Sequence, residues 1–360
     1  MSKRIERRKT RRIMVGSVPV GGNAPIAVQS MTNTKTSNLA ATVAQIQRLT
    51  EAGCEIVRVA VPDQEAAAAI QNIKKEIQVP LVADIHFDHR LAIAAAKSGA
   101  DALRINPGNI GGKKRLRKVV EVAADLGISL RIGVNSGSIE KSLLRKYGGP
   151  TPQAMVESAL NHLAFLEDLG FREVKVSLKS SNVGDTIEAY RLFSQKADYP
   201  LHLGVTEAGP LVPGLVKSAI ALGTLLMEGI GDTLRVSLTS DPINEVRAAY
   251  EILRTLDLRH RGPEIISCPT CGRCEIDLFR LVHEVEKALI TVPAPLKVAI
   301  MGCVVNGPGE AREADIGIAG GRGQGILFKK GKVVKKIPED ELVNALIEEI
   351  KALKGGQPVS

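Results

Sequence analysis

The chain has 360 residues, of which 44% are hydrophobic and 3% are aromatic, and it contains no Trp. This length accommodates a barrel-sized domain of about 250 residues and a second domain of roughly 100. So few aromatic side chains argue against a stacking platform for single-stranded nucleic acid.

The formal net charge of +9 is concentrated near the N-terminus. Residues 3–12 hold seven basic side chains and one acidic side chain, so six of the nine net charges lie there. Blocks of like charge usually face solvent, and we therefore expect a solvated basic tail rather than a nucleic-acid arm. There is no run of 18 apolar residues and no apolar segment typical of a secretory signal, which predicts a cytoplasmic protein.

The first expected element is a hairpin in R-I-M-V-G-S-V-P-V-G-G (12–22), placed to plug the bottom of a barrel. Short β-branched runs then alternate with longer amphipathic stretches up to about residue 255, which is typical of repeated βα units. Eight such units predict a (β/α)8 TIM barrel, and an open doubly wound sheet is the alternative. The expected strands are 26–30, 56–61, 81–86, 102–106, 129–135, 173–179, 201–207 and 234–239.

The pattern changes after residues 259–263, where we place a short hinge between a barrel domain (1–260, with the tail and hairpin in 1–25) and a second domain (264–360). A small α+β domain is expected from short strands and two helices, at 277–289 and 339–351. A lysine-rich stretch near its end predicts a turn and an exposed strand edge. Its members are Lys329, Lys330, Lys332, Lys335 and Lys336.

Polar side chains recur at the carboxyl ends of the expected barrel strands, where TIM barrels carry their active sites. Because side chains alternate along a strand, several of these residues share one face of each strand. So many cations at one mouth predict an anion between them, and a guanidinium suits the paired oxygens of a phosphate or diphosphate. The alternative is ordinary strand-end salt bridges with Asp84, Asp101, Glu173 or Asp232. The residues concerned are Arg58, Arg104, Asn106, Arg131, Asn135, Lys175, Ser177, Lys179, Arg235, Ser237 and Thr239.

Three further strand-end residues are acid–base candidates: His86, His202 and Glu207. A lone histidine is more often a hydrogen-bonded structural residue than a catalyst. Glu207 is the first choice, since a carboxylate beside an anion site is placed to exchange a proton with a bound substrate.

Cys268, Cys271, Cys274 and Cys303 cluster in the last hundred residues and indicate a metal site, because thiolates select zinc, copper(I) or iron–sulfur clusters. Three interpretations stay open: an all-thiolate 4Fe-4S cluster, structural zinc, or iron held by three thiolates and a fourth ligand of another type. The remaining cysteine, Cys54, is expected to be a buried small hydrophobic residue at a strand start.

Six long motifs together resemble the bacterial 4-hydroxy-3-methylbut-2-enyl diphosphate synthase family, also called IspG or GcpE, in its compact two-domain form. The resemblance spans the whole chain. It rests on A-L-R-I-N-P-G-N-I-G, R-I-G-V-N-S-G-S, H-L-G-V-T-E-A-G, E-G-I-G-D-T-L-R-V-S-L-T, C-P-T-C-G-R and M-G-C-V-V-N-G-P-G-E-A.

That resemblance implies a TIM barrel followed by a small sulfite-reductase-like domain with a 4Fe-4S cluster. It also implies reductive ring opening and dehydration of 2-C-methyl-D-erythritol 2,4-cyclodiphosphate, an isoprenoid precursor of the methylerythritol phosphate pathway. Flavodoxin or ferredoxin would supply electrons, and a homodimer would build each active site from the barrel of one subunit and the cluster domain of the other.

By the same resemblance, the cluster ligands would be Cys268, Cys271, Cys303 and Glu310, with Cys274 outside the cluster. Glu207 would be the essential barrel carboxylate, and His86, His202 and Lys175 are further candidates. The diphosphate would lie among Arg58, Arg104, Arg131, Asn135, Lys179, Arg235 and Ser237.

Two rival functions use parts of the same pattern. A zinc-ribbon barrel protein would bind phosphorylated ligands or nucleic acid without redox chemistry, but it does not explain N-G-P-G-E beside Cys303. A pterin-binding methyltransferase barrel would use polar strand ends but needs no terminal cysteine cluster.

Overall fold

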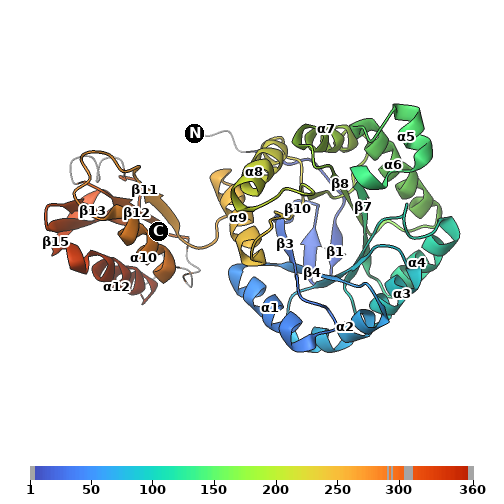
Figure 1. Cartoon of the computed structure of the whole chain (residues 1–360), viewed down its shortest axis with the longest axis horizontal. Helices are drawn as coiled ribbons and strands as arrows, with labels where there is room; N and C mark the ends of the chain where they lie inside the picture. The colour runs from blue at the N-terminus through green and yellow to red at the C-terminus, as the bar shows by residue number, and fades with distance from the viewer. Residues whose placement is uncertain (1–4, 290–291, 293–294, 304–310, 356–360) are drawn as a thin grey trace. The chain divides into compact units, whose positions relative to one another are not determined.

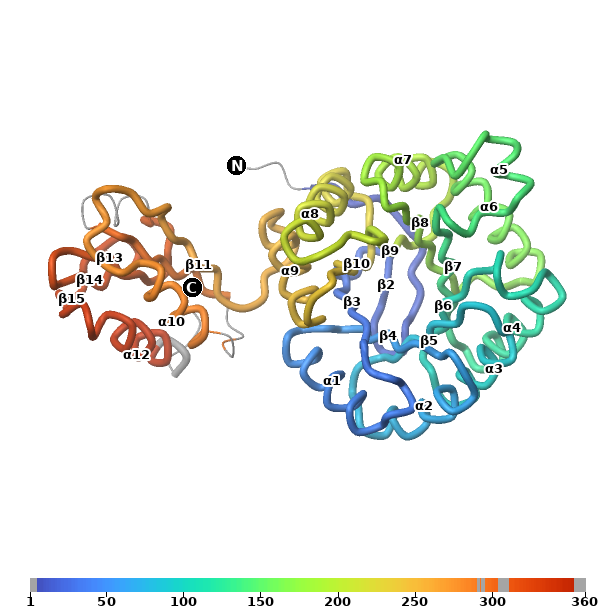
Figure 2. The backbone as a smooth tube through the Cα atoms, in the orientation of Figure 1, coloured from blue at the N-terminus to red at the C-terminus, as the bar shows by residue number. Residues whose placement is uncertain are grey.

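The chain divides into two units between Arg259 and His260. The computed structural model describes residues 5–289, 292, 295–303 and 311–355. The first unit runs from blue to yellow in Figures 1 and 2, and the second from orange to red. Among the described residues, no helix combines the length and the apolar character needed to cross a bilayer.

Eight parallel strands form the centre of the first unit, and helices surround them (Figures 1 and 2). Their order in the sheet is β8-β7-β6-β5-β4-β3-β10-β9. A parallel bridge between Val176 and Leu201 joins β8 to the start of β9, so the sheet closes on itself. The strands are β3 (Ala27–Met31), β4 (Ile56–Ala60), β5 (Leu81–Ile85), β6 (Ala102–Ile105), β7 (Ser129–Asn135), β8 (Val174–Lys179), β9 (His202–Leu203) and β10 (Thr233–Leu234).

The expected (β/α)8 barrel is therefore confirmed, although its last two strands are shorter than the sequence predicts. Beyond Leu203, a Cβ atom on Gly204 would lie 2.9 Å from the carbonyl oxygen of Arg235, and the Arg235 amide donates a 3.0 Å hydrogen bond to the Leu203 carbonyl. The two segments therefore stay close just beyond the regular ladder of β9 and β10.

A helix follows each barrel strand, as the amphipathic stretches predict. In α1, Asn38 accepts a hydrogen bond from the Ala41 amide at the first turn, and Gly53 ends the helix with a left-handed φ of 108°, a conformation that glycine adopts without a steric penalty. The helices are α1 (Leu39–Ala52), α2 (Gln64–Glu76), α3 (His89–Lys97), α4 (Lys113–Asp125), α5 (Lys141–Tyr147), α6 (Pro152–Asp168), α7 (Val183–Ser194), α8 (Leu211–Met227) and α9 (Pro242–Thr255).

The expected N-terminal hairpin is present as β1 (Ile13–Val15) and β2 (Val18–Val20), paired antiparallel. Its buried Ile13, Val15 and Val20 pack with residues at the start of barrel strands, such as Ile56 and Ala102. The hairpin thus covers the bottom of the barrel and leaves the opposite end for a site.

The basic segment before this hairpin is bound to the barrel. Arg7 forms a 3.0 Å ion pair with Asp232, and Arg8 donates hydrogen bonds of 2.6 Å to the carbonyls of Ala197 and Tyr199. The expectation of a solvated tail is wrong for the described part of this segment. Carbonyl groups and a buried carboxylate at the lower strand ends supply partners that a charge count cannot reveal.

The second unit is a mixed five-stranded sheet in the order β11-β12-β13-β14-β15. Its helices α10 (Leu278–Leu289) and α12 (Leu342–Gly355) pack on one face through apolar side chains such as Leu281, Leu346 and Ile350. The strands are β11 (Glu264–Ser267), β12 (Lys297–Met301), β13 (Ile316–Gly321), β14 (Gln324–Lys329) and β15 (Lys332–Pro338). Strand β15 lies at the edge and is mostly exposed, which confirms the predicted lysine-rich edge.

Candidate active site at the barrel mouth

A cavity of about 350 Å³ opens at the carboxyl ends of the barrel strands. Most of the strand-end residues singled out in the sequence line it. They are Arg58, His86, Arg104, Arg131, Asn135, Ser177, Lys179, Glu207, Arg235, Ser237 and Thr239. Lys175 and His202 do not line it, because both are buried deeper in the barrel.

Strand register places the cations side by side. Arg104 on β6 lies opposite Arg131 on β7, which lies opposite Lys175 on β8. Four residue pairs further along the same ladder, Asn135 lies opposite Lys179. The barrel thus gathers side chains that are far apart in the sequence.

Two glycines leave room for these long cations. A Cβ atom on Gly133 would lie 2.9 Å from Nε of Arg104, and a Cβ atom on Gly204 would lie 2.4 Å from Nζ of Lys179. Glycine in β7 and just after β9 therefore makes room for the cation cluster.

Two buried carboxylates offset part of the positive charge. A carboxylate oxygen of Asp84 lies 3.2 Å from a terminal nitrogen of Arg104, and the other lies 3.7 Å from Nε of Arg58. A carboxylate oxygen of Glu245 lies 3.2 Å from a terminal nitrogen of Arg235. Burial by itself would raise the pKa of Asp84, but its cationic neighbours hold that pKa well below its usual range. The salt-bridge alternative is correct for Asp84, whereas Asp101 and Asp232 pair instead with Lys74 and Arg7, away from the mouth.

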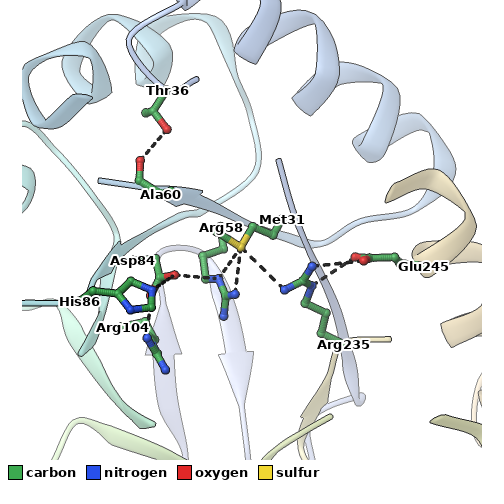
Figure 3. Close-up of polar contacts among 9 residues, drawn as sticks. All are labelled: Met31, Thr36, Arg58, Ala60, Asp84, His86, Arg104, Arg235 and Glu245. Atoms are coloured by element: carbon green, nitrogen blue, oxygen red, sulfur yellow. Dashed lines mark hydrogen bonds and ion pairs between the residues drawn. The ribbon is translucent and has the colours of Figure 1, made fainter. Parts of the chain in front are cut away.

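A chain of polar contacts crosses the mouth from β5 to α9 (Figure 3). Met31, the last residue of β3, points its sulfur at both arginines: Sδ lies 2.9 Å from a terminal nitrogen of Arg58 and 3.7 Å from one of Arg235. Asp84 forms an ion pair with Nε of Arg58, and Glu245 forms one with a terminal nitrogen of Arg235. The two arginines are thereby oriented across the opening.

Positive charge exceeds negative charge among the described residues of the barrel interior. Six basic side chains stand against the two buried carboxylates. Nε and one terminal nitrogen of Arg131 lack a hydrogen-bond partner in the described structure, as does Nε of Arg104. Burial, followed by the nearby guanidinium charges, lowers the pKa of Arg131 and of Lys179 well below their usual values. A bound anion would relieve this repulsion, so the geometry favours a phosphate or diphosphate site.

Glu207 lies exposed at the rim and lines both this cavity and a second one of about 230 Å³. Its φ of 53° is left-handed, which costs a residue with a side chain of the order of 1–3 kcal/mol and is frequent at functional sites. The second cavity is lined by amide and hydroxyl groups, including Asn106, Asn109 and Ser138.

The two candidate histidines occupy different surroundings. His86 is half exposed, lines both cavities and lies 3.3 Å from Asp84. His202 is fully buried, and its Nδ1 lies 2.9 Å from the Thr233 hydroxyl. Burial, followed by the charge of Arg131, lowers the pKa of His202 well below its usual value, so its imidazole is neutral beneath the cavity.

Three cysteines of the second unit, Cys268, Cys274 and Cys303, lie at one end of its sheet. Cys268 follows β11 and Cys303 follows β12, and these two strands are adjacent and parallel. The Gly302 amide donates a 3.3 Å hydrogen bond to Sγ of Cys268, and a Cβ atom on Gly302 would lie 2.7 Å from Sγ of Cys274. Glu310 lies outside the described residues.

The donor set fits an iron–sulfur cluster, because soft thiols on adjacent strand ends are the ligands that such clusters take. Among the described residues, no three His, Cys, Asp or Glu side chains are close enough to hold one metal ion. Cys54 is buried, and burial raises the pKa of its thiol to about 12, which confirms it as a core residue.

Comparison with known families accounts for both units. A model described as the GcpE TIM-barrel domain matches residues 10–250, and one described as the GcpE protein C-terminal domain matches residues 264–352. The chain belongs to the GcpE family.

Curated relatives agree with this assignment over almost their full length. A protein of Thermodesulfovibrio yellowstonii named 4-hydroxy-3-methylbut-2-en-1-yl diphosphate synthase (flavodoxin) is 60% identical over 96% of this chain and 99% of its own. Relatives with the same name from Lawsonia intracellularis and Geobacter sulfurreducens are 61% and 57% identical, covering 96% of this chain and 96% and 98% of their own.

Solved structures resemble the GcpE barrel in fold alone. Dihydropteroate synthase from Stenotrophomonas maltophilia aligns with a TM-score of 0.51 at 14% identity, covering 69% of this chain and 97% of that one. At this identity the structural similarity supports the barrel architecture alone and supports no inference about function.

Two residues of the GcpE-family site were missed by the sequence analysis. Met31 comes directly after the expected first strand, and Glu245 lies in the first turn of α9, ten residues after Arg235. An acidic residue in a first helical turn usually interacts with the helix dipole, so the pattern gave no signal that this side chain turns inward to an arginine.

Proposed function

We propose that this chain catalyses the reductive ring opening and dehydration of 2-C-methyl-D-erythritol 2,4-cyclodiphosphate to 4-hydroxy-3-methylbut-2-enyl diphosphate. The observation that carries the proposal is a buried cation cluster with too few counter-ions, in a chain about 60% identical to synthases of that name along almost their whole length. The zinc-ribbon alternative is not favoured by these relatives.

The cation cluster supports a binding role for the diphosphate. Asp84 and Glu245 form ion pairs with Arg58 and Arg235, which restrict the two guanidinium groups before a ligand binds. Their remaining nitrogens can therefore donate to phosphate oxygens with a smaller loss of side-chain entropy. Arg131 has unpartnered nitrogens beneath them. We assign the diphosphate to Arg58, Arg104, Arg131, Asn135, Lys179, Arg235 and Ser237.

Glu207 is the proposed proton donor. Ring opening consumes two electrons and two protons and releases one water, so an oxygen must be protonated as its bond to carbon breaks. Glu207 lies at the rim beside the cation cluster and lines the cavity. The neighbouring pair of His86 and Asp84 is placed to orient the substrate or to relay a proton.

The second unit is the proposed electron-transfer domain. Cys268, Cys271 and Cys303 would hold a 4Fe-4S cluster together with Glu310, while Cys274 donates a hydrogen bond to the Ile276 carbonyl and stays outside the ligand set. When bound, such a cluster supplies electrons one at a time. Flavodoxin, which the relatives' names print, or ferredoxin would reduce it.

The test combines composition with turnover. Protein purified without oxygen is expected to contain about four irons and four sulfides per chain, and to form the allylic diphosphate when given the cyclodiphosphate and a reduced carrier. Stoichiometric zinc without sulfide, even after anaerobic reconstitution, would contradict the proposal.

Two cysteine variants form a matched pair for the ligand set. Cys268→Ser is expected to lose most of the iron and the visible absorption of the cluster. Cys274→Ser, which changes a cysteine six residues further along the chain, is expected to retain both. An equal loss in the two variants would count against the assignment of Cys274.

A further inference from the structure

Beneath the cavity, three basic side chains on neighbouring strands are buried with nitrogens that have no hydrogen-bond partner in the described structure. They are Arg131 on β7, Lys175 on β8 and His202 on β9, with exposed fractions of 1%, 1% and 0%. Lys175 is the most isolated of them, since its single nitrogen, Nζ, is unpartnered. A buried, unpaired ammonium group is costly, so its presence calls for a physical explanation.

The surroundings of Lys175 are almost entirely cationic. Arg131 lies opposite it on β7, Lys179 lies four residues along its own strand, and the charge of Arg58 on β4 also acts on it, while the neighbouring imidazole of His202 is neutral. The nearest carboxylates at the mouth, Asp84 and Glu245, are engaged by arginines, and Tyr190 uses its hydroxyl on the His202 carbonyl. Burial, followed by the charges of Arg131 and Arg58, lowers the pKa of Lys175 to about 7.

We propose that Lys175 is an anion-linked proton acceptor: when a diphosphate binds in the cavity above, the amine of Lys175 takes up one proton from solvent and becomes an ammonium group. The inference rests on the anion-binding part of the proposed function and extends it to a residue outside the cavity lining. No other group changes its bonding in this step, because the amine lone pair accepts the proton directly.

The coupling follows from electrostatics. Without an anion, a proton on Lys175 adds another positive charge to a cluster that already repels it. A multiply charged diphosphate reverses the sign of the local potential, so the protonated form becomes the favoured one. Binding and protonation then assist each other by equal amounts, as linkage requires.

Calorimetry of inorganic pyrophosphate binding tests this coupling without cluster or turnover. Titrations at about pH 8, where Lys175 would start neutral, are run in two buffers with different ionisation enthalpies. Wild type is expected to take up about one proton more per pyrophosphate than Lys175→Met, and to bind roughly tenfold more tightly. The control Lys114→Met removes an exposed lysine from α4 and should match wild type in proton uptake and in affinity. If Lys175→Met does not fold, Lys175→Gln replaces it in the same measurement.

Stability provides a second measurement with a defined sign. The folded pKa of Lys175 lies below its unfolded value of about 10.4, so the unfolded chain binds more protons between these values and wild-type stability rises with pH there. Lys175→Met lacks this dependence. Its melting temperature should exceed that of wild type by about 2–4 °C near pH 7, and the gain should shrink towards pH 10 and on addition of pyrophosphate.

The outcomes separate the two proposals. If wild type binds no pyrophosphate, both the anion site and this inference fail. If wild type and Lys175→Met bind with the same proton count and the same pH dependence of stability, the anion site stands and the role of Lys175 is wrong.

Discussion

At the scale of single residues, the barrel mouth depends on how each cation is held. Arg235 is fixed by Glu245 and Arg58 by Asp84, while the Met31 sulfur lies between the two guanidinium groups (Figure 3). Charged hydrogen bonds of this kind orient the donors that remain. Within the described part of the chain, Nε and one terminal nitrogen of Arg131 have no hydrogen-bond partner, so they are available to a ligand.

Glu207→Gln tests the proposed proton donor. The amide preserves shape but cannot donate the proton in the same way, so turnover should fall by about 10²–10⁴-fold. Pyrophosphate affinity and melting temperature should change little, because the side chain is exposed at the rim. Steady-state kinetics with a reduced carrier and calorimetry measure the two effects, and a variant with near-normal turnover would remove Glu207 from this role.

Gly204→Ala tests whether the missing side chain makes room for Lys179. A methyl group would lie 2.4 Å from Nζ of Lys179 and 2.9 Å from the Arg235 carbonyl. Overpacking should lower the free energy of unfolding by about 1–3 kcal/mol and weaken pyrophosphate binding. Gly223→Ala in α8 is the control, because a Cβ atom there meets nothing within 4 Å and should stabilise by about 0.5–1 kcal/mol.

At the scale of elements, the βα alternation predicts the barrel well because each unit carries its own periodic apolar pattern and helix-ending signal. Strand β7 matches its expected range, and most of the others differ by one or two residues at their ends. Strands β9 and β10 are the exception, since each has only two residues in the regular ladder, and the close packing at Gly204 involves Lys179 and Arg235 from elsewhere in the barrel.

The N-terminal segment is an element whose role rests on tertiary contacts. Arg8→Ala would leave the carbonyls of Ala197 and Tyr199 without their donor, which should cost about 1–3 kcal/mol of unfolding free energy. Lys9→Ala removes a neighbouring exposed charge and should have almost no effect. Chemical denaturation of both variants measures this, and equal stabilities would show that the segment is only loosely attached.

At the scale of the whole molecule, the proposed chemistry needs groups from both units. The anion site is formed by residues of the first unit, which ends at Arg259. The cysteines proposed to hold the cluster belong to the second unit, which begins at His260. A homodimer in which the second unit of one subunit serves the barrel of the other would bring these groups together.

Mixing two inactive variants tests the shared site. Glu207→Gln disables the barrel and Cys268→Ser disables the cluster domain, so a mixed dimer would contain one intact pair of units. We expect the mixture to regain up to about a quarter of wild-type activity if subunits exchange randomly, while each variant alone stays inactive. Absence of any recovery, with exchange verified by labelled subunits, would contradict the shared site.

The sequence by itself determined the barrel, the second domain and the strand-end cations, because local periodicity and the polarity of parallel strands fix these features. The tertiary structure alone decided which groups meet across the mouth. The contacts of Met31 with Arg58 and Arg235 and the docking of Arg7 and Arg8 all depend on residues distant in the chain, and Glu245 turns to Arg235 on another element. Pairing between remote side chains depends on how the barrel closes, and no local pattern contains that information.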